Sequence, residues 1–161
     1  INADKDLHKY EQFGALKALE FQKDFETLAF TSGNRDQTAP AQRMTDFVEG
    51  KLSSTLNETS YQPGIKSALL HSLFPKIIGS SLRKGFKAFG DKMKGYYTEE
   101  ANIIGVESRT SSPVSIPRTD QLHHPEISNL YPCGEGAGYA GGIISAAMDG
   151  ERCAEAATGN L

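Results

Sequence analysis

The residues best suited to chemistry lie near the carboxyl end of the chain, in a run that reads Asn-Leu-Tyr-Pro-Cys-Gly-Glu-Gly-Ala-Gly-Tyr-Ala-Gly-Gly-Ile over residues 129–143. Its glycines are Gly134, Gly136, Gly138, Gly141 and Gly142. Glycine has no Cβ atom to hold a planar or phosphorylated ligand away from the backbone, and it adopts the positive φ angles of tight turns. The pattern predicts a strand, a glycine-rich turn and then a helix whose N-terminus directs N–H groups at a ligand.

Residues 136–141 satisfy the literal pattern G-x-G-x-x-G of dinucleotide-binding domains. That fingerprint also needs a second parallel strand ending in an acidic residue about 20 positions further on. Glu155 has roughly this offset, but it lies inside the helical pattern of residues 143–157. We therefore interpret the run as a terminal strand-helix unit, and we expect the rest of any nucleotide-binding sheet to come from elsewhere. The absence of an initiator methionine before Ile1 favours the same interpretation, that of a fragment.

Two polar side chains accompany the glycine run. The carboxylate of Glu135 could accept hydrogen bonds from sugar hydroxyls, or it could stabilise the start of the following helix by charge–dipole attraction. Cys133 could be a redox thiol, or it could be a small strand residue buried in the core. The sequence leaves both alternatives open.

A polar turn at residues 108–112 separates two expected short strands, over residues 102–107 and 113–116. Its candidate binding residues are Arg109, Thr110, Ser111 and Ser112. An arginine presents a planar fork of donors that matches an anionic group, and the hydroxyls supply further donors. The turn therefore predicts an anion site, with a polar turn that binds nothing as the alternative.

Composition narrows the class of protein. The chain has 161 residues and a formal net charge of −3, which argues against a generally basic nucleic-acid-binding protein. No apolar run approaches the roughly 18 residues that span a bilayer, and the two cysteines lack metal-ligand or C-x-x-C spacing. His123 and His124 are adjacent but have no further ligand at a suitable spacing, so we expect no metal site. These features predict a cytoplasmic protein with neither nucleic acid nor membrane as partner.

The elements expected to position these residues are mostly helical in the first part of the chain. Hydrophobic spacing predicts helices over residues 10–30, 40–48, 64–74 and from 76 to about 94. The last of these is amphipathic and basic, which is typical either of a phosphate or NADP site or of a solvated face. Short strands and the terminal strand-helix unit follow, so the predicted fold class is α+β.

Residues 130–150, preceded by residues 106–114, resemble the C-terminal part of the uncharacterised FAD-dependent dehydrogenases. These are bacterial flavoproteins with a glutathione-reductase-like FAD domain. The resemblance implies FAD as cofactor, with NAD(P)H as a candidate reductant. It places Gly134 and Glu135 where such proteins carry Gly-Asp at a ribityl hydroxyl. It also implies that Gly141, Gly142 and Ile143 present N–H groups to the flavin N1 and O2 atoms.

The same resemblance implies a domain organisation and a function. Residues 1–100 would belong to a helical substrate or interrupting domain, and residues 101–161 would return into the FAD domain and complete its α/β sheet. The chain would then be the C-terminal portion of an FAD-dependent oxidoreductase. Its partner would be the N-terminal remainder of the same polypeptide, because the glycine motif for the ADP half of FAD is absent here. By itself this fragment would be inactive and would hold FAD poorly.

Within that oxidoreductase, the turn at residues 108–112 would face the flavin from the side of a small-molecule substrate, with Arg109 and Cys133 as catalytic candidates. The rival interpretation is a non-enzymatic helical interaction or regulatory module, in which the glycines only allow tight helix packing. A reductase that binds NADP without flavin is a third alternative.

Overall fold

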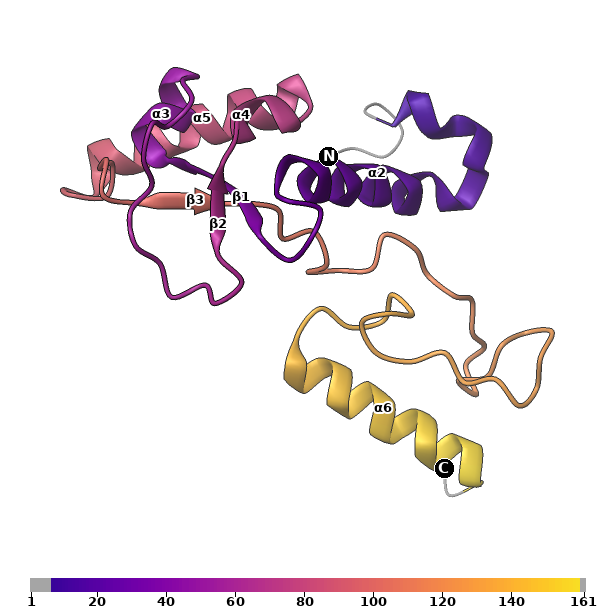
Figure 1. Cartoon of the computed structure of the whole chain (residues 1–161). Helices are drawn as coiled ribbons and strands as arrows, with labels where there is room; N and C mark the ends of the chain where they lie inside the picture. The colour runs from indigo at the N-terminus through magenta and orange to yellow at the C-terminus, as the bar shows by residue number, and fades with distance from the viewer. Residues whose placement is uncertain (1–6, 160–161) are drawn as a thin grey trace. The chain divides into compact units, whose positions relative to one another are not determined.

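The computed structural model of the chain describes residues 7–159 (Figure 1). It divides into two compact units: Lys23–Val106 forms the first, and residues 7–22 with 107–159 form the second. The elements in chain order are the 3-10 helix η1 (His8–Leu16), α2 (Lys17–Ser32), β1 (Ala39–Arg43), α3 (Met44–Glu49), β2 (Ile65–Ser67), α4 (Leu70–Leu73), α5 (Lys76–Lys92), β3 (Asn102–Ile104) and α6 (Ile143–Thr158). The predicted α+β class is confirmed.

The first unit is built on a three-stranded sheet in the order β2-β1-β3. The central strand β1 runs parallel to β2 and antiparallel to β3, with Ala41 opposite Ile104. Figure 1 shows α3, α4 and α5 on one side of this sheet. Phe47, Val48 and Leu70 are buried between these layers and form the core. The ring of Phe47 meets those of Phe74 and Phe86 edge-on, at centroid distances of 6.1 and 5.8 Å.

The structure corrects three of the predicted helices. The helix predicted over residues 10–30 is an α-helix only from Lys17 onward, because residues 8–16 form the 3-10 helix η1, inside which Gly14 has a non-helical φ of 53°.

Residues 40–48 are not one helix, because strand β1 occupies the first part and α3 begins only at Met44. Pro40 marks a helix start in the sequence, but here it lies in a strand and its carbonyl oxygen accepts a hydrogen bond from the Gly105 N–H at 3.1 Å. Residues 64–74 likewise divide into strand β2 and the short helix α4. In both places pairing with a neighbouring strand outweighs local helix propensity.

The predicted helix ends were more accurate where glycine or proline marks them. Helix α3 stops at Gly50, which has a left-handed φ of 77° and donates its N–H back to the helix. Helix α5 begins directly after Pro75. Arg83 of α5 donates from Nε to the carbonyl oxygen of Val48 at 2.6 Å and so satisfies a carbonyl near the end of α3.

The second unit contains η1, the first residues of α2, an extended segment over residues 107–142, and α6. Within residues 7–159 no strand forms over residues 113–116 or 129–133, and the strand expected over 102–107 is shortened to β3. A strand exists only where a second backbone pairs with it over successive residues, and at those places the described backbone shows isolated hydrogen bonds instead, from the Ile116 N–H to Ala137 and from the His124 N–H to Leu130. No described helix has the length and apolar character needed to cross a membrane.

Candidate functional site

The predicted glycine turn is present and leads directly into α6. Within it the N–H of Gly138 donates to the carbonyl oxygen of Glu135, and the N–H of Tyr139 donates to that of Gly134, both at 3.0 Å. Gly134 and Gly138 have positive φ angles of 69° and 85°. A Cβ atom on Gly138 would lie 2.7 Å from the carbonyl oxygen of Val114. Glycine is therefore required at residue 138 by both its backbone angle and its packing.

An ion pair fixes this turn to the middle of α6. The guanidinium of Arg118 donates from Nη2 to Asp149 Oδ1 at 2.7 Å and from Nη1 to Asp149 Oδ2 at 3.0 Å. The two side chains are only 10% and 9% exposed. The N–H of Gly134 donates to the same Oδ2 at 2.8 Å. The first glycine of the turn is thus held against the helix by a carboxylate that the arginine orients.

The surroundings of Arg118 complete this arrangement. Its Nη1 also donates to the carbonyl oxygen of Pro132 at 2.9 Å. The guanidinium carbon lies 3.6 Å from the centre of the Tyr139 ring, a cation–π contact. The hydroxyl of Tyr139 in turn donates to the carbonyl oxygen of Ile116 at 2.8 Å. Arg118 therefore connects α6 with the segments on both sides of the turn.

The charges of the pair stabilise each other. The hydrogen bond from Arg118 holds the pKa of Asp149 below its ordinary value, with a further contribution from the Gly134 N–H, while burial opposes the shift. The hydrogen bond to Asp149 correspondingly raises the pKa of Arg118. The turn is thus held by a permanently charged pair at neutral pH.

Sequence reasoning missed Arg118, Asp149 and Tyr139. One signal was present: Asp149 directly follows a run of small and apolar residues over 143–148, and an acidic residue beside such a run often has a buried partner. Its partner lies 31 residues away along the chain, in a segment without periodicity. No rule of sequence spacing predicts that Arg118 and Asp149 pair.

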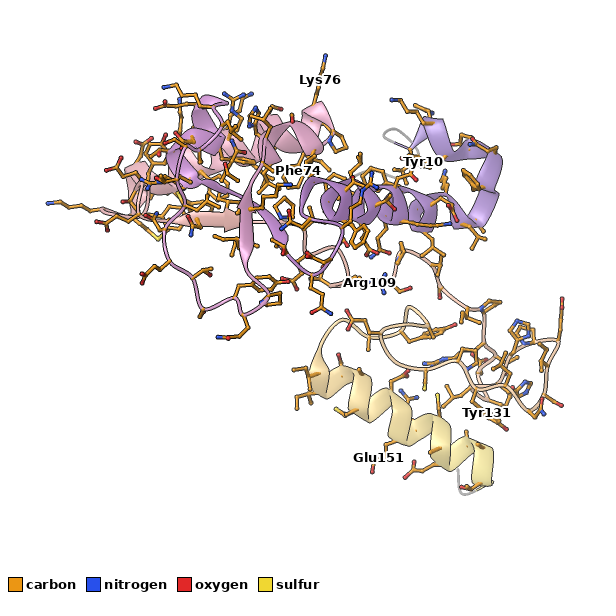
Figure 2. All side chains as sticks on the ribbon, viewed as in Figure 1. Tyr10, Phe74, Lys76, Arg109, Tyr131 and Glu151 are labelled. Atoms are coloured by element: carbon orange, nitrogen blue, oxygen red, sulfur yellow. The ribbon has the colours of Figure 1, made fainter. Side chains whose placement is uncertain are left out.

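The four candidate binding residues of the predicted anion turn, residues 109–112, differ in where their side chains lie. The hydroxyl of Ser112 lies 2.7 Å from the carbonyl oxygen of Val114 and 3.1 Å from that of Gly136, so it contacts the glycine turn. Ser111 Oγ lies 3.9 Å from the position of a Cβ on Gly141. Arg109 (Figure 2) is exposed, and so is Thr110 next to it in the chain. The structure thus brings the two serines to the turn and leaves the other two side chains at the surface.

The turn also carries the remaining predicted residues. Glu135 is partly buried and Gly136 is exposed. Cys133 is exposed, which contradicts the alternative of a buried strand residue, and the buried thiol is Cys153 on α6.

The N-terminus of α6 is open. Gly142 is its N-cap, and the Gly142 N–H donates to Ser145 Oγ at 3.2 Å. Glycine supplies no side-chain oxygen to the first-turn N–H groups.

The apolar side chains at the start of α6 are exposed: Ile143, Ile144 and Met148 are 90%, 73% and 59% exposed. A Cβ on Gly136 would meet no heavy atom of residues 7–159 within 4 Å. Backbone donors beside an exposed apolar surface suit a planar ring with an electron-rich edge, so the residues present fit a flavin.

The basic helix α5 lies in the first unit. Lys76 projects from its start (Figure 2), and Lys84, Lys87 and Lys92 are exposed. Lys87 also lines a surface depression of about 410 Å³ together with Gly90, Asp91, Gly95 and Tyr97. This depression includes an acidic as well as a basic side chain. Phosphate recognition by α5 stays a prediction beside the solvated-face alternative.

Comparison with known proteins identifies the family. The family model described as "FAD-dependent protein, C-terminal domain-like" matches residues 1–110. An uncharacterized protein of Clostridium beijerinckii is 42% identical over 142 residues, which is 87% of this chain and 27% of that relative. The similarity to the relative is longer than the family match and therefore extends beyond residue 110. The chain spans little more than a quarter of the relative's length. By the family match, this chain belongs to the FAD-dependent protein C-terminal domain-like family.

Proposed function

We propose that the chain is the C-terminal portion of an FAD-dependent oxidoreductase and that its glycine turn and α6 N-terminus contact the flavin ring. The family match supports FAD as the cofactor. One observation carries the placement of the ring: the Arg118–Asp149 pair holds Gly134, the first glycine of the turn that leads into the N-terminus of α6, against the middle of that helix. A dehydrogenase reaction and a glutathione-reductase-like architecture belong to this proposal.

FAD when bound would supply a ring that accepts and returns electron pairs. The chain's own contribution is a fixed electrostatic one. The Gly142 N–H donates to Ser145 Oγ, so it reaches a ligand only after that side chain rotates. The N–H groups of Gly141 and Ile143, with the positive end of the α6 dipole, stabilise negative charge at the N-terminus of the helix. Because Asp149 and Arg118 fix the turn before any ligand arrives, these donors need little reorganisation. Ser111 lies beside Gly141, and Ser112 contacts the glycine turn at Gly136.

Substrate contacts in this proposal come from the exposed side chains near the turn. Arg109 is the candidate for an anionic group of a small-molecule substrate or of NAD(P)H. Cys133 is the exposed thiol closest in sequence to the turn. Both reach solvent, as residues that meet a diffusing substrate must.

The first test concerns the cofactor itself. The full-length protein is expected to show visible flavin absorption that dithionite bleaches, and the isolated chain is expected to retain little flavin. A full-length protein without a chromophore would contradict the proposal and favour the packing-module alternative. Stoichiometric flavin on the isolated chain would contradict the expectation that the ADP half of the site lies outside it.

The second test concerns the placement of the ring. Gly142 has extended backbone angles, with φ at −150°, so other residues can occupy it. Asp and Asn are both favoured N-caps, but only Asp adds a negative charge. G142D is expected to lower the flavin midpoint potential or expel the flavin, and G142N is expected to do so far less. Equal flavin content and potential in both variants would show that this helix end does not contact the ring.

A further inference from the structure

The segment that carries Cys133 is held along one face of α6. Asp149 and Cys153 lie one helical turn apart on the buried side of α6. Asp149 accepts the hydrogen bond from the N–H of Gly134 at 2.8 Å, and the Cys153 thiol lies 3.8 Å from the carbonyl oxygen of Pro132. Cys133 is the residue between these two contacts. Its backbone is therefore aligned with the helix face that carries the other cysteine.

The two thiols differ in access. Cys133 is exposed, whereas Cys153 is only 3% exposed. Burial raises the pKa of the Cys153 thiol, and the neighbouring Asp149 carboxylate and Cys133 thiol add to that rise. The Arg118 guanidinium opposes the rise, with Nη1 at 3.3 Å from Cys153 Sγ. An exposed thiol thus neighbours a buried thiol that has a cation beside it. This arrangement favours reaction of a small disulfide with Cys133 first, followed by attack of Cys153 on the resulting mixed disulfide.

We propose that Cys133 and Cys153 form a thiol pair that closes reversibly to an intramolecular disulfide by exchange with a low-molecular-weight disulfide. The Cys133 thiolate attacks one sulfur of the small disulfide, which forms a mixed disulfide and releases one small thiol that takes up a proton. The Cys153 thiolate, stabilised by Arg118, then attacks the Cys133 sulfur and releases the second small thiol. Two protein thiols are oxidised, and one small disulfide is reduced to two thiols.

The closed disulfide would add a covalent link between the residue before the glycine turn and the middle of α6. The Gly134–Asp149 contact already joins these segments without a covalent bond. The link would draw Cys153 Sγ away from Arg118 and restrict the start of the turn. This inference concerns only thiol chemistry and stands independently of flavin binding.

Tryptic digestion separates the two cysteines, so it can reveal a disulfide between them. Trypsin cuts after Arg118 and Arg152, and no lysine or arginine lies between them, so Cys133 and Cys153 fall in different peptides. The reduced chain is treated with glutathione disulfide, the remaining thiols are alkylated, and the monomer fraction is digested without reductant. The expected product is one linked pair of peptides, with the intact chain lighter by two hydrogen atoms. The disulfide should reopen with dithiothreitol.

Two matched variants test the order of attack. C153S keeps the exposed thiol and should accumulate a persistent glutathione adduct on Cys133. C133S keeps the buried thiol and should stay reduced at Cys153 over the same time. A wild-type chain that ends with glutathione on Cys133 and no linked peptides would overturn the proposal. Linkage found only between two chains, or rapid modification of Cys153 in C133S, would also overturn it.

Discussion

Arg118 and Asp149 form a two-fold hydrogen-bonded ion pair, and the carboxylate uses its remaining acceptor capacity on the backbone N–H of Gly134. A pair of side chains far apart in sequence therefore sets the position of a backbone turn. The local geometry of the turn comes from its glycines, but its attachment to α6 comes from this charge pair.

Removing one partner of this pair should weaken the second unit. D149N leaves Arg118 charged and largely buried beside a neutral group, which typically costs about 3 kcal/mol of unfolding free energy. Urea unfolding followed by circular dichroism measures the change. The matched control is E151Q, two residues along the same helix on an exposed face (Figure 2), for which a change within about 0.5 kcal/mol is expected.

The double variant R118Q/D149N separates charge from packing. With both charges removed no unpaired ion remains, so part of the loss in D149N should be recovered. A D149N stability equal to that of E151Q would show that the pair does not hold the unit together.

The Arg118–Asp149 pair should also make the stability of the turn's attachment to α6 depend on pH. The folded-state pKa of Asp149 lies below its ordinary value, so its contribution to stability is present above the ordinary carboxyl range. It is lost as the pH falls through the lowered pKa. Amide hydrogen exchange at Gly134 measures this directly, because its N–H donates to the carboxylate. Protection, corrected for the intrinsic exchange rate, should fall on acidification in the wild type and vary less in D149N.

Two glycines of the turn should respond differently to replacement by alanine. G138A places a side chain at a positive φ and against the Val114 carbonyl oxygen, so it should lower the free energy of unfolding by about 1–3 kcal/mol. G136A adds a methyl group in open space at an ordinary backbone angle and should leave stability almost unchanged. In the full-length protein G136A should nevertheless weaken FAD retention if the ring approaches this residue. Unchanged flavin content in G136A would place the ring elsewhere.

Arg109 is predicted to anchor an anionic substrate or nicotinamide phosphate. A charge-assisted hydrogen bond contributes about 1.5–3 kcal/mol, so under the proposed function R109A in the full-length protein should raise KM roughly tenfold or more with little change in kcat. R152A removes an exposed arginine from α6 and serves as the control. Unaltered KM and reductive half-reaction in R109A would eliminate this role.

The sequence alone located the glycine turn, the start of α6 at Ile143, the start of α5 after Pro75 and the end of α3 at Gly50. Each of these depends on local signals, because glycine and proline restrict or release the backbone at their own position.

The tertiary structure alone decided which segments became strands and what holds the turn. Residues 39–43 and 65–67 are strands because their backbones pair with each other, and residues 129–133 are not a strand because no described backbone forms a ladder with them. Asp149 pairs with Arg118, which lies 31 residues away along the chain. Such contacts depend on the path of the whole chain, and a linear pattern of residue types does not encode that path.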